Sequence, residues 1–182
     1  MNTGMLSARY AKALFAYATE QGVEDAVYDS MKVLVRSRLE MKNLLILLRD
    51  PALKPQERVE HICSMLDASP VIRRFVQLVV EEEREGLLIF IAHSYIALYR
   101  EKKEVYAVRF ITAVPLDDSA KKAIENILES KENKRVEVEY AVDASIIGGF
   151  MMETLSRRVD ASVEGQLRRI RKDIIKQNRK LV

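Results

Sequence analysis

The sequence is poor in the residues that cross-link, ligate metals or span membranes. It contains one cysteine, Cys63, and two histidines, which excludes an internal disulfide and leaves too few ligands for a typical zinc site. No apolar run reaches the ~18 residues of a membrane-spanning helix, and the N-terminus lacks the apolar core of a signal peptide. We therefore expect a chain that stays where it is made, most simply in a bacterial cytoplasm.

Groups that could carry catalysis are equally scarce. No serine, cysteine or lysine stands in a motif that would activate it, and two histidines offer little for acid–base chemistry. The runs Glu81–Glu83 and Asp117–Asp118 are typical of solvated helix ends. The adjacent Gly148 and Gly149 fit neither glycine-rich phosphate-binding pattern. The sequence thus predicts a protein without an active site, cofactor or metal.

The few glycines and prolines mostly stand where a helical pattern breaks. Apolar residues at helical spacing predict helices over residues 5–21, 23–39, 56–66, 70–85 and 87–103, with a short apolar piece at Asn43–Leu48. Gly22 is suited to end the first helix, and Ser69-Pro70 to begin the fifth. Residues 1–104 are therefore expected to form a bundle of six helices with short connections.

The pattern changes after Glu104. Residues 134–142 alternate apolar and charged side chains, as a half-buried strand does. Further strands are predicted at 105–114 and 150–155, with a short fourth near 158–160, and helices at 116–130 and from Val163 onward. The fold class is thus α+β: an N-terminal six-helix bundle, residues 1–104, followed by a small β-α-β-β-α domain, residues 105–182.

Two helices of the bundle carry more apolar surface than one core requires. The first has two adjoining stripes: Leu6, Tyr10, Ala13, Leu14 and Tyr17, and beside them Ala8, Ala11, Phe15 and Ala18. The fifth leaves only Arg73, Arg74 and Gln77 for water. Such helices are either central in the bundle or have a second partner, which would be an amphipathic helix in a groove between them.

Basic charge is concentrated at the C-terminal end. From Arg157 onward nine basic residues outnumber three acidic ones, although the net charge of the chain is only +3. The last helix also presents one apolar stripe: Val163, Leu167, Ile170 and Ile174. A basic helix can be a solvated face, or it can bind nucleic acid, anionic lipid or an acidic protein partner.

The segment Val142–Leu167 joins two glycines, an apolar run, an Asp-x-Ser element and the start of this basic helix. Two glycines indicate positive φ or close backbone approach, and Asp160 and Ser162 can cap the helix that follows. This order resembles the C-terminal signature of the delta subunit of F-type ATP synthases, called the oligomycin-sensitivity-conferring protein in mitochondria. The matching residues are Ile147, Gly148, Gly149, Phe150, Asp160, Ser162, Val163, Leu167 and Ile170.

The segment Ala8–Phe15 resembles the opening of the same family. The resemblance implies a non-catalytic stator connector of a proton-translocating enzyme, on the cytoplasmic face of the bacterial inner membrane and held there only through the complex. It implies that residues 1–104 bind the catalytic head through the N-terminal helix of an alpha subunit, and that residues 105–182 bind the b subunit of the peripheral stalk. The implied alpha contacts are Tyr10, Ala13, Leu14, Phe75, Leu78 and Val79.

Three positions depart from the family pattern, because glycine is replaced near Glu83, Leu155 and Ala161, which leaves the local turns undetermined. A second reading of the chain is an RNA-binding helical adaptor with a basic α/β domain. Against it, the strands lack the paired exposed aromatics of an RNA-recognition sheet, and no G-x-x-G loop is present. We therefore expect protein partners and no nucleic acid.

Overall fold

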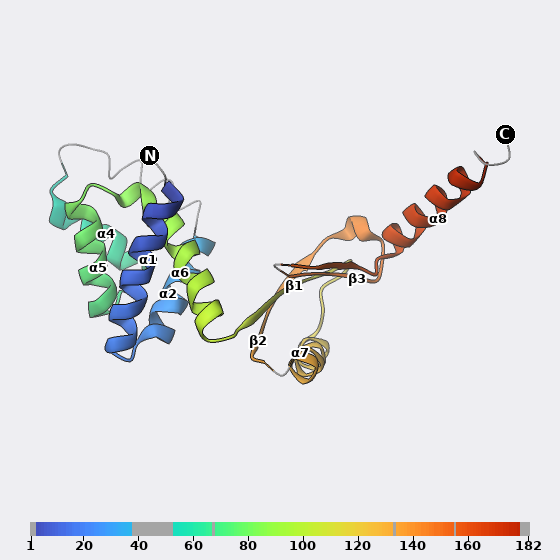
Figure 1. Cartoon of the computed structure of the whole chain (residues 1–182), viewed down its shortest axis with the longest axis horizontal. Coiled ribbons are helices and arrows are strands. Elements are labelled where there is room, and N and C mark those ends of the chain that lie inside the picture. Colours follow the sequence, from blue (N-terminus) through green and yellow to red (C-terminus); the bar gives the residue numbers. More distant parts are fainter. Residues whose placement is uncertain (1–2, 38–52, 67, 133, 155, 179–182) are drawn as a thin grey trace. The chain divides into compact units, whose positions relative to one another are not determined.

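The computed structural model describes residues 3–37, 53–66, 68–132, 134–154 and 156–178 (Figure 1). The chain divides between Lys103 and Glu104 into two compact units. The first is helical, and the second holds a four-stranded sheet with helices. The predicted combination of N-terminal helices with a small sheet domain is confirmed. None of the described helices has the length and apolar character that crossing a bilayer requires.

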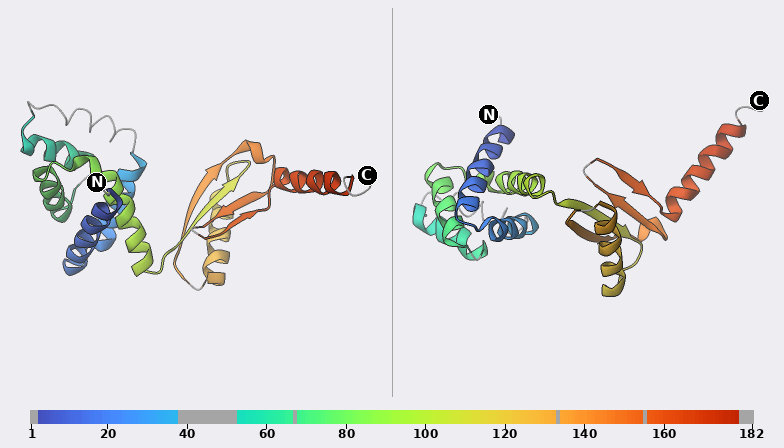
Figure 2. Two further views of the ribbon diagram at one scale, coloured as in Figure 1. Left: turned by 45° about the horizontal axis from the view of Figure 1, so that its top comes forward. Right: turned by 60° about the horizontal axis from the view of Figure 1, so that its bottom comes forward.

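Five α-helices and one 3-10 turn make up the described part of the helical unit. They are α1 (Thr3–Glu20), α2 (Glu24–Arg36), α4 (Pro55–Leu66), α5 (Pro70–Glu81), η1 (Glu85–Leu87) and α6 (Leu88–Lys102). Helix α6 lies along both α1 and α2, whereas α5 packs mainly on α4 (Figure 2). The predicted apolar piece at Asn43–Leu48 falls outside the described residues.

The core of this unit contains tyrosines with satisfied hydroxyl groups. Tyr95 is fully buried and donates to the carbonyl oxygen of Glu24, and burial raises its pKa. Tyr99 stacks on Tyr28 at a centroid distance of 4.0 Å and donates to the Asp25 carboxylate. These contacts tie the start of α2 to the last turns of α6, so the helical unit is closed at the end from which the chain continues.

Helix α5 ends earlier than the periodicity predicts, at Glu81 instead of about Glu85. The Arg84 N–H donates to the Val79 carbonyl at 2.9 Å, and the Glu83 N–H donates to Val80 at 3.0 Å, which together form a Schellman cap. Glu83 occupies the left-handed region, with φ 54°. A glutamate thus adopts the conformation for which glycine is favoured, and the turn persists without the family glycine.

The second unit is a mixed sheet with two α-helices. Its elements are β1 (Tyr106–Thr112), α7 (Asp118–Glu132), β2 (Val136–Val142), η2 (Ala144–Ile146), β3 (Phe150–Glu153), β4 (Arg158–Asp160) and α8 (Val163–Asn178). The strand order is β2-β1-β3-β4, with β1 parallel to β2 and antiparallel to β3. Helix α7 is therefore the crossover that a parallel pair requires.

The two faces of the sheet are covered differently. On one face Phe110 stacks on Phe150 at 5.0 Å, and the Tyr140 hydroxyl donates to the Lys121 carbonyl on α7. Burial raises the pKa of Tyr140 to about 12. On the other face Ile111 and Met151 form a small cluster with Ile146 of η2. This η2 turn also contacts α8.

Candidate partner-binding sites

A hollow of about 330 Å³ lies between α1 and α5, and we call it the α1–α5 groove. It is lined by Tyr10, Ala13, Leu14, Tyr17, Arg74, Phe75 and Leu78. Leu14 and Phe75 are buried, whereas Leu78 is 47% exposed. The base of the groove thus consists of the core residues Leu14 and Phe75, and Leu78 beside them is exposed at the surface.

Each helix has a separate set of residues for the interior. Ala11 and Ala18 of α1 are fully buried, as are Ile72 and Val76 of α5. The apolar side chains of the groove stand on a neighbouring arc of the same helices. On α1 the stripe of Ala11 and Ala18 thus faces the core, whereas the stripe of Tyr10 reaches the core at Leu14 and is open at the surface at Ala13.

Tyr10 is held on two sides. Its ring meets Phe75 edge to face at 6.4 Å, and its hydroxyl oxygen accepts a hydrogen bond from Arg84 Nη1 at 2.7 Å. At the other end of the groove the Arg74 guanidinium lies 5.6 Å from the centre of the Tyr17 ring. An apolar floor between two guanidinium groups is complementary to an amphipathic helix that carries acidic residues beside its apolar stripe.

The structure brings together five of the six residues expected at this site. The sixth, Val79, is fully buried and faces the interior of the helical unit. Tyr17 and Arg74 also line the groove, although the sequence did not single them out as contacts. Tyr17 could have been found from its place on the stripe of Tyr10. Arg74 was predicted to face water, because nothing in the sequence indicates that its guanidinium group lies against the ring of Tyr17.

The start of α8 is fixed by the Asp-x-Ser element. Ser162 is fully buried at the N-cap, and its Oγ accepts from the Gly165 N–H at 2.9 Å. The Ser162 N–H and Oγ both donate to Asp160 Oδ1, at 3.0 and 2.5 Å. These bonds, with Arg169 nearby, lower the pKa of Asp160. Only Ser162 caps the helix directly, and Asp160 positions Ser162.

Glycines allow the segment just before β3 to approach this element closely. Gly149 has φ +73°, and a Cβ there would lie 2.4 Å from the Ala161 carbonyl oxygen. Gly148 accepts from the Val163 N–H at 3.0 Å. Gly165, which the sequence did not single out, faces Asp160 so closely that a Cβ would lie 2.6 Å from Oδ1. Gly165 could have been found from the sequence because it is a glycine inside a helical pattern.

The rest of α8 carries an apolar stripe that the described residues leave uncovered. Val163, Leu167, Ile170 and Ile174 are 40%, 55%, 55% and 52% exposed. We call these four residues the α8 stripe. The basic residues Arg168, Arg169, Arg171 and Lys172 are exposed on the same helix. This helix therefore offers apolar contact and positive charge together.

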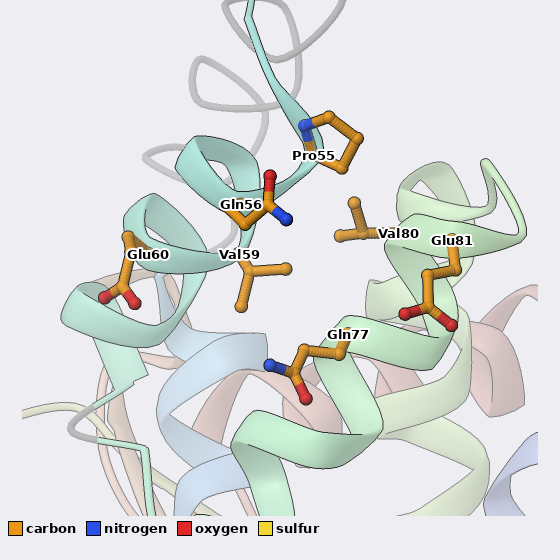
Figure 3. Close-up of a pocket in the computed structure, with 7 residues that line it drawn as sticks. All are labelled: Pro55, Gln56, Val59, Glu60, Gln77, Val80 and Glu81. Atoms are coloured by element: carbon orange, nitrogen blue, oxygen red, sulfur yellow. The ribbon is translucent and has the colours of Figure 1, made fainter.

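A smaller pocket of about 110 Å³ lies between α4 and α5 (Figure 3). Val59 and Val80 face one another in it, and the Glu60 and Glu81 carboxylates lie on opposite sides. Glu60 already pairs with Arg73 at 2.5 Å. A space of this size holds only a few water molecules, so it is not assigned to a partner.

Comparison with known proteins agrees with the fold. The family model described as ATP synthase delta (OSCP) subunit matches residues 6–174. The ATP synthase subunit delta of Phocaeicola vulgatus is 36% identical over 185 residues and covers 100% of both chains. That of Parabacteroides distasonis is 37% identical over 177 residues, 96% of this chain and 98% of the relative.

More distant proteins give the same result, and none of those found supports an RNA-binding adaptor. The ATP synthase subunit delta of Lactobacillus acidophilus is 31% identical over 175 residues, 95% of this chain and 96% of the relative. A chain in the cryo-EM structure of the Toxoplasma gondii mitochondrial ATP synthase hexamer shares the fold. Its TM-score is 0.67 at 20% identity, over 93% of this chain and 97% of that one. The chain therefore belongs to the ATP synthase delta (OSCP) subunit family, whose members are non-catalytic subunits in the peripheral stalk of F-type ATP synthases.

Proposed function

We propose that this subunit joins the catalytic head to the peripheral stalk of a proton-translocating ATP synthase. In this proposal the helical unit, residues 1–104, binds the head, and residues 105–182 bind the b subunit. The complex lies on the cytoplasmic face of the bacterial membrane, and this subunit reaches the membrane only through the complex. Holding the head still while the rotor turns couples rotation to ATP synthesis, and it requires two firm contacts and no chemistry.

The head contact is the N-terminal helix of an alpha subunit in the α1–α5 groove. The observation that carries this proposal is the apolar surface at Tyr10, Ala13 and Leu78, which the core of the unit does not use. The small side chain of Ala13 lets another helix approach closely. Arg74 and Arg84 can pair with carboxylates on the flanks of that helix.

The stalk contact is the α8 stripe. Its residues follow one another at intervals of four, three and four, which is the spacing of a coiled-coil seam. Arg168, Arg169, Arg171 and Lys172 add positive charge to this helix. A helix of the b subunit with an apolar seam and acidic flanking residues is complementary to this surface.

Two variants of the full chain test both contacts at once, each serving as the control for the other. We expect Leu78→Asp to abolish retention of the alpha subunit in co-purification but to leave the b subunit bound. We expect Leu167→Asp to have the opposite effect. Both residues are about half exposed, so the fold should persist, which circular dichroism verifies. Loss of both partners in either folded variant, or of neither, contradicts the assignment.

A further inference from the structure

A second hollow adjoins the α1–α5 groove at the N-terminal half of α1. It measures about 830 Å³, and its apolar lining comes from Met5 and Leu6 of α1, Leu87 of η1 and Phe90 of α6. Met5 is 65% exposed and Phe90 53%. Arg9 and Glu83 stand among the charged residues at its edge. The hollow is thus open to solvent and places four large apolar side chains beside charged ones.

The two hollows are continuous along α1. Leu6 lines the second hollow, and Tyr10, one helical turn further along the same stripe, lines the first. Arg84 lines the second hollow and donates to the Tyr10 hydroxyl. The Arg84–Tyr10 pair therefore lies where the two hollows meet, and both hollows are lined by residues of α1.

Exposed apolar residues are concentrated in these two places. In the described part of the helical unit the large apolar side chains exposed to solvent are Met5, Val33, Leu78 and Phe90. Three of these four line one hollow or the other, and only Val33 lies elsewhere. Single exposed apolar residues are common, but a contiguous group marks an interaction surface.

We propose that both hollows bind one continuous helix, the alpha N-terminal helix assigned above, and that Phe90 and Met5 contact its far end. This inference rests on the proposed function and extends it. From Met5 to Tyr17 α1 rises about 18 Å at 1.5 Å per residue, so the partner needs roughly 12 helical residues, more than three turns. Its apolar stripe continues past the Arg84–Tyr10 pair into the second hollow.

The test measures binding of alpha N-terminal peptides to the full chain by calorimetry. The peptides are the complete helical segment and versions shortened by one turn at a time from either end. The variants are Phe90→Ala and Met5→Ala in the second hollow, Leu78→Ala in the first, and Val33→Ala as the control. All four side chains are exposed by 43% or more, so each variant is expected to fold.

We expect Phe90→Ala and Met5→Ala each to weaken the complete peptide about fivefold or more, and Val33→Ala to have no effect. Shortening the peptide from one end should remove the effect of Phe90→Ala while the effect of Leu78→Ala remains. If only Leu78→Ala weakens binding, the extension is wrong and the proposed function stands. If Phe90→Ala weakens every shortened peptide equally, Phe90 does not contact one particular end of the alpha helix, and the extension is wrong. If no variant weakens binding, the proposed function fails as well.

Discussion

Arg84 Nη1 lies 2.7 Å from the hydroxyl oxygen of Tyr10, and this hydrogen bond joins residues 74 positions apart in the sequence. Arg84 follows Glu83, whose left-handed conformation ends α5. The turn after α5 therefore aims a guanidinium group at α1, where it holds a tyrosine between the two hollows. A local backbone feature thus positions a residue of the candidate partner surface.

Tyr10 is expected to act as an anchor of the alpha helix. Tyr10→Ala removes the ring that packs on Phe75, and it should weaken binding of an alpha N-terminal peptide by about 1–4 kcal/mol. Tyr10→Phe keeps the ring and should have a smaller effect. Calorimetric titration measures both. Equal binding by Tyr10→Ala and the wild type, or unfolding of that variant, would show that the groove is ordinary core.

Glu83→Gly is expected to stabilise the helical unit by up to about 1.5 kcal/mol. A left-handed conformation costs a non-glycine residue about 1–2 kcal/mol, a cost that glycine avoids. Glycine has greater backbone entropy in the unfolded chain, and this reduces the gain by about 0.5–1 kcal/mol. Glu82→Gly is the matched control, because Glu82 has φ −87° and should only lose stability. Urea unfolding measures both. A destabilised Glu83→Gly would mean that the glutamate side chain itself supports the turn.

Gly165→Ala should destabilise the C-terminal unit, although alanine ordinarily favours a helix over glycine by about 1 kcal/mol. The added Cβ would lie 2.6 Å from the Asp160 carboxylate, so the bonds that hold Ser162 would have to shift. We expect a loss of about 1–3 kcal/mol in thermal unfolding. Gly4→Ala, where no atom lies within 4 Å of the new Cβ, should be neutral or stabilising. Similar behaviour of the two variants would refute the role assigned to Gly165.

The start of α8 should weaken in acid. The Ser162 hydrogen bonds lower the pKa of Asp160 in the folded state, so its contribution to stability is present above the unfolded pKa. That contribution is lost as the pH falls through the folded pKa. In Ser162→Ala the pKa of Asp160 should rise toward its ordinary value of about 3.9. NMR titration of the carboxyl carbons measures it.

Asp143 is the internal control for this titration. Its pKa is lowered in the same way, by hydrogen bonds from Ser145, on a different turn. Ser162→Ala should leave the pKa of Asp143 unchanged. An unchanged pKa of Asp160 in that variant would assign the lowered value to the backbone N–H of residue 162 and the nearby arginines instead.

The sequence by itself determined the order of helices and strands, the stop at Gly22 and the capping serine at Ser162. These features depend on the repeat of apolar residues and on the conformations that single residues allow. Both are set by residues that are close together in the sequence. It also indicated that the first and fifth helices have unusually wide apolar arcs, which fit either two central helices or helices with a second partner. Periodicity records how wide an apolar arc is, but not which part of that arc other helices cover.

Only the tertiary structure decided that Val79 faces the core and Leu78 the groove. It also decided that α5 stops at Glu81, that Arg84 reaches Tyr10, and that Gly165 has no room for a side chain. Each of these depends on the positions of atoms that the chain brings together from separate elements or turns. The physical reason is that steric contact and hydrogen bonding act over a few ångströms in space, whatever the separation in sequence.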